Sequence, residues 1–529
     1  MSQLSFNRLK NTAIVIAAIS LTGVSTPNHA HEDGHARPSI NLSVLSQLRI
    51  GGYDQGAAEI VAYDVNSQRA FITNAQDSSV DVISITKPAS PTKLFSINLK
   101  PYGKVNSVAV HNGTVAVALG AKNKQDNGRV AFFNDQGEHL NTLTVGALPD
   151  MLTFTPDGNT LLVANEGEPN SDYSVDPEGT ISIIKLDEKQ AQDLTQDDVK
   201  SVDFHYFDDV TLDKSVRFFG KGASRAQDLE PEYIAVSEDS TTAWISLQEN
   251  NAIATLNINS GKITKISGLG YKSYNSQKNA IDASDKDGGI NIKPWPVLGM
   301  YQPDSIASYT YNGRHYIVTA NEGDARDYDG YSEETRLAKV TLDEKLLNDY
   351  PNIQDEKNLG RLKITTANGD TNGDGKIDQI YSYGARSFSI WNANGDQVFD
   401  SNAEFATKVA SRYPKLFNKA DSRSDDKGAE PEALTLGKVG EQTYAFIGLE
   451  RTGGIMAYNI SNPKHAYYAD YINTISHALP DDDAKQGDIA PEGLAFVSAQ
   501  DSPNGKPLLL SANEVSGTFS IYLIEETEK

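Results

Sequence analysis

The sequence predicts an all-β fold, a single β-propeller of the YVTN/WD40-like type, and three observations support this class. A unit of roughly 25 to 40 residues recurs along the chain, and each copy alternates apolar strands with polar turns. Turns such as Pro156-Asp157-Gly158 and Tyr311-Asn312-Gly313 supply the Gly or Asn that a hairpin needs. Helical periodicity is confined to short patches such as LDEKLLNDY and AEFATKVASRY. Many short strands with a radial repeat favour a propeller over a sandwich.

The repeat predicts eight blades, with seven as the alternative. Clear copies of the unit begin at Ala57, Pro149, Glu230, Pro303, Glu430 and Pro491, and weaker copies begin at Val105 and near Ile380. The last unit stops after its third strand, FSIYLI, whereas residues 40–50 (INLSVLSQLRI) form an extra strand before the first unit. We expect this N-terminal strand to complete the last blade and remove an exposed edge; the alternative is a flexible N-terminus.

Residues 1–30 have the pattern of an export signal. Arg8 and Lys10 precede the apolar run TAIVIAAISLTGV, and the small residue Ala30 suits a cleavage site. The run is short for a membrane span, so an uncleaved anchor is the weaker alternative. We therefore expect a signal peptide over 1–30, a flexible segment over 31–39 and one propeller domain over 40–529. The mature protein is expected in the periplasm or outside the cell, including at the cell surface.

Composition excludes several classes of function. The formal net charge is -24, which disfavours nucleic acid and anionic lipid and favours cations and basic partners. The chain contains no cysteine, which excludes disulfides, thiol chemistry and covalent haem attachment. There is no G-x-S-x-G elbow and no Walker loop, and His29, His31 and His35 lie in the predicted leader or flexible N-terminal segment.

Two sets of acids recur at fixed places in the unit. The first set stands at the start of the first strand, and the second set follows the second strand. Because consecutive strands of a blade are antiparallel, both sets are expected at one mouth of the central channel. The first set is Glu59, Asp150, Glu232, Asp304, Glu432 and Glu492, and the second is Glu166, Glu249, Glu322, Glu450 and Glu514.

Crowded carboxylates indicate a bound cation. Within about 4 to 6 Å they repel and raise one another's pKa unless a cation or hydrogen bonds compensate. Ca²⁺ takes six to eight oxygen ligands and suits such a cluster. Further acids in the same loops are Glu168, Glu230, Asp324, Asp327, Glu430 and Asp488. The alternative is that the acids cap strands or pair with Arg225, Arg326, Lys427 and Arg451.

A single arginine occupies the corresponding region of the divergent unit near Ile380. Arg386, in GARSFSIW, would suit a bidentate contact with a phosphate or carboxylate ligand, or else a structural ion pair.

Residues 370–378, DTNGDGKID, resemble the first part of an EF-hand loop. Asp370, Asn372, Asp374 and Asp378 fall at positions 1, 3, 5 and 9, and Gly375 falls at the turn position. Position 12 is Tyr381 rather than a bidentate glutamate, so other groups must complete the coordination. We expect Ca²⁺ here in a structural role, with an ordinary Asp-Asn-Gly turn as the alternative.

Several motifs together resemble the choice-of-anchor I family, which includes mesenchyme-specific cell-surface glycoprotein-like proteins and bacterial proteins labelled alkaline phosphatase. The resemblance runs from about residue 40 to the C-terminus, through EGEPNSDYSVDPEGTISII, GARSFSIWNANGDQVFDS, KGAEPEALTLG, LERTGGIMAYNI, PEGLAFV and LLLSANEVSGTFSIYLI. It implies an exported propeller, held at the cell surface in many members, and it implies little chemistry. The chain shows no sorting motif after FSIYLIEETEK, so we expect a freely secreted or periplasmic protein.

Two functions fit these features. The first is calcium-dependent binding of a cationic or metal-bridged ligand, such as a phosphate ester or a cell-surface protein, at the acidic mouth. The second is a calcium-dependent phosphoesterase, resembling alkaline phosphatases and propeller phytases, with Glu232, Glu432, Glu492 and Arg386 as catalytic candidates. A purely structural assembly surface is a third reading. Fold analogy alone is a weak basis for catalysis, so binding is the favoured prediction.

Overall fold

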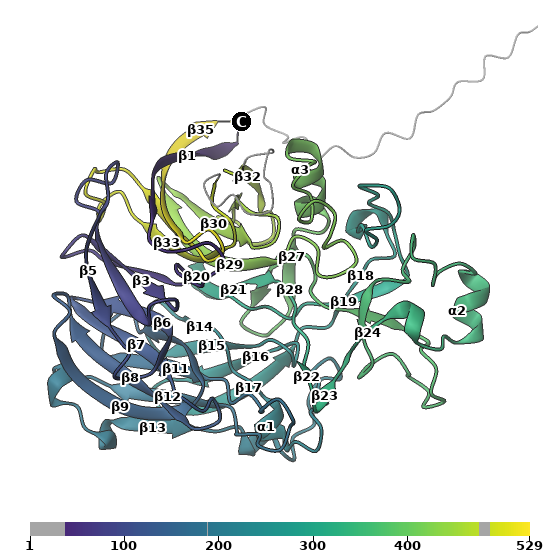
Figure 1. Ribbon diagram of the computed structural model, residues 1–529, viewed down its shortest axis with the longest axis horizontal. Coiled ribbons are helices and arrows are strands. Elements are labelled where there is room, and N and C mark those ends of the chain that lie inside the picture. Colours follow the sequence, from purple (N-terminus) through teal and green to yellow (C-terminus); the bar gives the residue numbers. More distant parts are fainter. Residues whose placement is uncertain (1–36, 188, 476–486, 529) are drawn as a thin grey trace, which may run out of the picture.

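The computed structural model describes residues 37–187, 189–475 and 487–528, which form a ring of radially arranged β-sheets (Figure 1). The predicted export signal, residues 1–30, lies outside the described residues. The described residues contain seven four-stranded sheets, together with a three-stranded sheet and two short hairpin-like pairs. The protein is thus an all-β propeller, as the repeat predicts.

Each blade is an antiparallel meander that runs from the channel outward. The first three sheets, in chain order, are β2 (Val61–Asp64), β3 (Arg69–Asn74), β4 (Ser79–Ser84) and β5 (Thr92–Asn98); β6 (Lys104–His111), β7 (Thr114–Gly120), β8 (Asn127–Asn134) and β9 (His139–Ala147); and β10 (Pro149–Phe154), β11 (Thr160–Asn165), β12 (Thr180–Lys185) and β13 (Val199–Val202).

The other four sheets follow the same plan with longer connections. They are β14 (Ile234–Val236), β15 (Thr242–Leu247), β16 (Ala252–Asn257) and β17 (Lys262–Gly268); β20 (Ile306–Tyr311), β21 (Arg314–Asn321), β27 (Ser387–Asn392) and β28 (Gln397–Asp400); β29 (Pro431–Val439), β30 (Gln442–Leu449), β31 (Ile455–Asn459) and β32 (Tyr467–Ile472); and β33 (Pro491–Val497), β34 (Leu508–Asn513), β35 (Thr518–Glu528) and β1 (Pro38–Arg49).

The N-terminal strand closes the ring. β1 runs antiparallel to β35, from Pro38 opposite Glu528 to Arg49 opposite Thr518. The innermost strands touch in the cyclic order β2, β6, β10, β14, β20, β29, β33 and back to β2. The predicted closure is therefore confirmed, and β1 begins at Pro38, two residues before the predicted boundary.

The unit predicted near Ile380 is not a separate blade, which corrects the count of eight. Its main strand, β27, pairs with β21 of the unit that begins at Pro303, with Ser387 opposite Asn321. Residues 322–386 are an insertion between these two strands. A repeat in the sequence shows where strands occur but not which strands pair with one another. One blade interrupted by an insertion therefore looks like two units.

The insertion and its neighbours form a lobe beside the ring, on the side of α2 in Figure 1. Its strands are β22 (Asp327–Tyr328) with β23 (Tyr331–Ser332), β24 (Glu334–Arg336) with β25 (Lys363–Thr365), and the sheet of β18 (Tyr271–Ser273), β19 (Val297–Met300) and β26 (Ile380–Ser382). The helices of the described residues are α1 (Arg225–Asp228), α2 (Glu344–Asp349) and α3 (Glu404–Arg412), with 3-10 turns at Ala191–Asp193, Gln196–Asp198, His205–Phe207, Gln277–Asn279 and Leu337–Lys339. Both predicted helical patches thus contain a helix.

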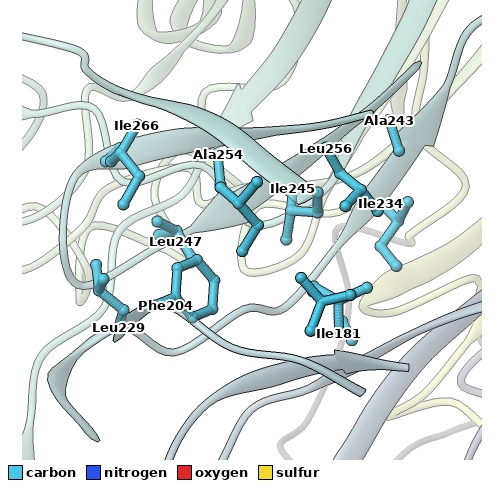
Figure 2. Packing of buried hydrophobic residues seen from close by; sticks show 14 of the residues in the cluster. Ile181, Phe204, Leu229, Ile234, Ala243, Ile245, Leu247, Ala254, Leu256 and Ile266 are labelled. Atoms are coloured by element: carbon cyan, nitrogen blue, oxygen red, sulfur yellow. The ribbon is translucent and has the colours of Figure 1, made fainter. Parts of the chain in front are cut away.

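The core lies between neighbouring blades. Figure 2 shows Ile181 of one blade packed toward Ile234, Ile245 and Leu256 of the next, with Phe204 from the connecting segment. Because both faces of a blade are covered, the second strands are buried over most of their length, and β11 and β34 are buried throughout. Burial of each large side chain stabilises the fold by about 1.5 to 3 kcal/mol. This packing fixes the strand ends that surround the channel.

Candidate cation site at the acidic channel mouth

The ladder register brings the two predicted sets of acids to one end of the blades. Pro149 lies opposite Asn165, Pro431 opposite Leu449 and Pro491 opposite Asn513. In each pair the next residue on either strand is one of the predicted acids. The first residues of the inner strand thus lie beside the last residues of the second strand, as the sequence predicts.

Three of the predicted acids form a compact oxygen cluster. Asp304, Glu322 and Glu432 each place a carboxylate oxygen within 4.8 Å of the other two. Glu322 also forms a second cluster of this kind with Glu430 and Glu450. These spacings are close enough for several carboxylates to share one ion.

Burial strongly disfavours the charged forms of these acids. Burial, followed by nearby carboxylates such as Glu514, Asp324 and Glu322, raises the pKa of Glu59, Glu249 and Glu450 to about 7 each. Burial likewise raises the pKa of Asp150 to about 6.

The ring is electrostatically continuous. The pKa of Glu232 is raised well above its usual range by burial, then by Glu249, Glu166, Asp304 and Asp150. Burial raises the pKa of Glu432 in the same way, followed by Glu450, Glu322, Glu492 and Asp304. The carboxylates of successive blades therefore repel one another across the channel.

Basic side chains neutralise one arc of the mouth. Lys427 Nζ lies 2.6 Å from Glu322 Oε1, and Arg451 Nη1 lies 2.7 Å from Glu450 Oε1. Glu430 accepts from Arg423 Nε at 2.6 Å and from Arg451 Nε at 3.2 Å. The predicted alternative of ion pairing thus holds for this arc. Over residues 37–187, 189–475 and 487–528, no Lys or Arg ion pair reaches Glu59, Asp150, Glu166, Glu232, Glu249, Asp304, Glu432, Glu492 or Glu514.

Three carboxylate oxygens of the two predicted acid sets are buried without a hydrogen-bond partner in the described part of the chain. They are Glu232 Oε2, Glu249 Oε2 and Glu432 Oε2. Glu249 is only 7% exposed, so solvent cannot satisfy this oxygen easily. An unsatisfied buried carboxylate oxygen costs more than an ordinary lost hydrogen bond. A hard cation is the ligand that such oxygens fit best.

Arg386 does not point at the acid ring. Its guanidinium donates to the carbonyl oxygens of Asp282 at 2.6 Å, Ser424 at 3.0 Å and Asp426. Burial lowers its pKa, and the side chain is nearly inaccessible. These contacts are those of a residue that holds a loop in place, rather than those of a ligand arginine.

Two further residues from the sequence analysis, Asp488 and Arg225, do not lie at the acidic channel mouth where they were expected. Asp488 accepts hydrogen bonds from Thr518, Ser520 and Tyr522 within the last blade. Arg225 donates to the carbonyl oxygens of Phe207 and Val210 and not to an acid of the mouth. Asp488 thus holds together part of the last blade, and Arg225 holds together the connection between β13 and β14.

The EF-hand-like loop is exposed and internally hydrogen bonded. Asp370 accepts from the backbone N–H groups of Gly373 at 2.7 Å and Gly375 at 2.8 Å, which lowers its pKa. Asp378 accepts from Thr371 Oγ1 at 2.6 Å. The acid side chains do not meet as a compact oxygen cluster among the described residues. Calcium at Asp370, Asn372, Asp374 and Asp378 stays a prediction.

A buried ionic network joins the insertion to the ring; ion pairing of Arg326 was the predicted alternative, whereas sequence reasoning missed Arg217. Arg326 pairs with Asp228 and lies 2.9 Å from Glu230, while Arg217 pairs with Glu333. Both guanidinium groups lie over the ring of Phe219, at 4.1 and 4.7 Å. No sequence signal marks the pair of Arg217 and Glu333, because the two residues lie in different connections.

None of the helices in the described residues has the length and apolar character that crossing a membrane requires.

Two curated relatives match parts of the chain. Gigasin-3a of Magallana gigas is 31% identical over 192 residues, 32% of this chain and 66% of that protein. The mesenchyme-specific cell surface glycoprotein of Strongylocentrotus purpuratus is 28% identical over 276 residues, 44% of this chain and 35% of that protein. The matches thus span just under two thirds of the first relative and about a third of the second.

Solved propeller structures resemble the chain only distantly. A chain of Kuenenia stuttgartiensis hydrazine synthase has a TM-score of 0.46 at 12% identity and covers 89% of this chain and 96% of that one. A streptogramin B lyase has a TM-score of 0.45 at 10% identity, with 92% and 98% coverage.

A family model for the choice-of-anchor I domain matches residues 59–463, which extend from the first blade into the sixth. This match covers most of the chain and agrees with the resemblance seen in the sequence motifs. The protein belongs to the choice-of-anchor I family.

Proposed function

We propose that this protein is an exported, calcium-binding propeller that holds a ligand or protein partner at its acidic channel mouth. The observation that carries the proposal is the set of buried carboxylate oxygens without partners, Glu232 Oε2, Glu249 Oε2 and Glu432 Oε2. Hydrogen bonds do not satisfy these oxygens, and the basic side chains of the mouth contact other acids. Calcium supplies the missing charge and accepts many oxygen ligands at once.

Calcium would act here as a bridge to the ligand. A mouth lined by acids repels an anionic partner, whereas a bound divalent ion offers it open coordination positions. A cationic partner would instead compete with calcium for the same oxygens. Calcium dependence of partner binding therefore distinguishes a metal-bridged ligand from a cationic one.

The arrangement favours binding over phosphoester hydrolysis. Arg386, the arginine predicted to hold a phosphate, is engaged by backbone carbonyls, and Lys427 and Arg451 are engaged by carboxylates. A phosphoesterase needs cationic groups free to contact the transferred phosphoryl group. The binding role needs only the carboxylates and the ion.

The test is calcium titration of the mature protein by calorimetry, with melting temperatures measured in calcium and in chelator. Glu232→Gln and Glu432→Gln are expected to weaken calcium binding at least about tenfold, because each removes a charged ligand. Glu238→Gln is the matched control, since Glu238 is an exposed acid of the same blade. Binding that is unchanged in both mouth variants would contradict the proposal.

A parallel assay with a generic phosphomonoester and a phosphodiester separates the two functions. Binding alone predicts no turnover in calcium or in chelator. Calcium-dependent turnover that both mouth variants abolish would make the acidic mouth an active site.

A further inference from the structure

We infer that Lys427 is a built-in competitor for the divalent cation at the Asp304–Glu322–Glu432 cluster. The inference rests on the proposed calcium function and concerns the regulation of that same site. Lys427 Nζ lies 2.6 Å from Glu322 Oε1, 3.7 Å from Asp324 Oδ1 and 3.8 Å from Glu430 Oε2. The protein thus places its own ammonium group beside an oxygen cluster suited to a metal.

The ammonium and a metal ion need the same carboxylate. Glu322 belongs to the cluster in which three oxygens lie within 4.8 Å of one another. Its Oε1 accepts from Lys427, and its Oε2 accepts from Gln248 Nε2 at 3.0 Å. A cation that enters this cluster therefore takes an oxygen already in use, or sits close to the Lys427 charge.

Glu432, the third member of the cluster, gives independent evidence for a bound cation. Glu432 Oε2 is buried and has no hydrogen-bond partner among the described residues. In the described part of the chain Lys427 forms ion pairs with Glu322, Asp324 and Glu430 but none with Glu432, so within the cluster the ammonium neutralises only Glu322. The charge of the cluster is only partly compensated, which favours the binding of a cation.

Contacts of Arg386 and Arg423 hold the loop that carries Lys427 in place. Arg386 donates to the carbonyl oxygens of Ser424 and Asp426, and Arg423 pairs with Glu430 at 2.6 Å. Gly428 has φ +77°, and a Cβ there would lie 3.0 Å from Arg386 Cδ. Arg386 is therefore a positioning residue that aims Lys427 at the mouth.

Lys427 remains charged while it competes. Burial alone would lower its pKa, but Glu322, Asp324 and Glu430 outweigh burial and raise the pKa well above its usual range. Its flexible four-carbon stem lets the ammonium leave the cluster without moving the loop backbone. The affinity for calcium then depends on how readily calcium displaces the Lys427 ammonium from the cluster.

Calorimetric calcium titration of the mature protein tests this exchange. Lys427→Met keeps the apolar stem and removes the charge, so calcium is expected to bind about tenfold tighter than in the unsubstituted protein. Lys427→Arg keeps the charge and is expected to bind calcium no tighter. Lys345→Met is the control, because Lys345 forms an exposed surface pair with Asp349.

Thermal unfolding gives a second measurement. In chelator, Lys427→Met leaves Glu322 with one fewer partner, so this variant is expected to melt at a lower temperature than the unsubstituted protein. Calcium should then raise the melting temperature of Lys427→Met by more than it raises the melting temperature of the unsubstituted protein. A variant that folds only with calcium would support the inference in the same way. If Lys427→Met does not fold, Lys427→Gln takes its place in both experiments, because glutamine keeps a hydrogen-bond donor for Glu322.

The failures of the two proposals are distinguishable. If neither the unsubstituted protein nor Lys427→Met binds calcium, the proposed function fails and the inference fails with it. If the unsubstituted protein binds calcium but Lys427→Met binds it equally or more weakly, only the competition is overturned.

Discussion

Glu249 and Glu322 occupy equivalent places after the second strands of two blades, yet their surroundings differ. Glu322 has Lys427 and Gln248 as partners, whereas Glu249 Oε2 is buried without one in the described chain. The same repeat position therefore produces a neutralised acid in one blade and an unsatisfied acid in the other. The difference lies in the long loops, which bring Lys427 to Glu322, whereas Arg326 pairs with Asp228 and Glu230 and forms no ion pair with Glu249 in the described chain.

Removing the unsatisfied charge of Glu249 is expected to stabilise the metal-free protein. Glu249→Gln should raise the melting temperature in chelator by a few degrees and reduce the further gain from calcium, because repulsion and metal binding have the same source. Glu238→Gln should change neither value by more than about one degree. A lower melting temperature for Glu249→Gln in chelator would show that this charge is compensated within the fold.

The raised pKa values predict how stability depends on pH. Glu59 and Glu450 have pKa values of about 7 in the folded protein, against 4.5 as the usual value. Stability from their protonated forms is complete below about pH 4.5 and is lost as pH rises through 7, because the unfolded chain ionises first. In chelator the melting temperature should fall between pH 5 and pH 8.

Calcium should reverse this trend, since the ion binds the ionised carboxylates and replaces their protons. Calcium affinity is therefore expected to rise over the same pH range. A melting temperature in chelator that rises steadily from pH 5 to pH 8 would contradict this assignment of the mouth.

At the scale of the element, strand β1 secures the last blade. Ile40 is fully buried in a cluster with Tyr444 and Phe446 of the neighbouring blade, whereas Val44 is 45% exposed. Ile40→Ala is expected to lower the free energy of unfolding by about 2 to 4 kcal/mol, and Val44→Ala by about 0.5 kcal/mol or less. Urea unfolding followed by tryptophan fluorescence measures both. Equal effects would show that β1 adds no packing beyond its backbone pairing.

The loop at residues 370–378 allows a test separate from the mouth. If it binds calcium, the ion should slow tryptic cleavage after Lys376 at least about fivefold, because a closed loop fits the protease poorly. Asp374→Asn should abolish this protection and leave calcium binding at the mouth unchanged. Asp355→Asn, a substitution of an exposed acid of the same insertion, is the control. Equal cleavage rates with and without calcium would leave the loop as an ordinary turn.

At the scale of the whole molecule, the ring concentrates part of a net charge of -24 at one channel mouth. Salt screens exposed charges over about 10 Å at 0.1 M but reaches buried ones much less. Raising sodium chloride from about 0.05 to 0.5 M should therefore raise the melting temperature in chelator by less than about 1 mM calcium does. If sodium chloride reproduces the whole effect of calcium, the stabilisation comes from general screening and not from a metal site.

The sequence by itself determined the propeller class, the closing role of the N-terminal strand and the two sets of acids, because these follow from strand alternation and antiparallel pairing within one unit. Local patterns could not reveal that β21 pairs with β27 across an insertion, or that Arg386 faces the 424–426 carbonyls. Only the tertiary structure decided which acids meet Lys427, Arg423 and Arg451 and which remain unpaired. The physical reason is that charge compensation depends on where long connections fold back over the channel, and their partners are far apart in the chain.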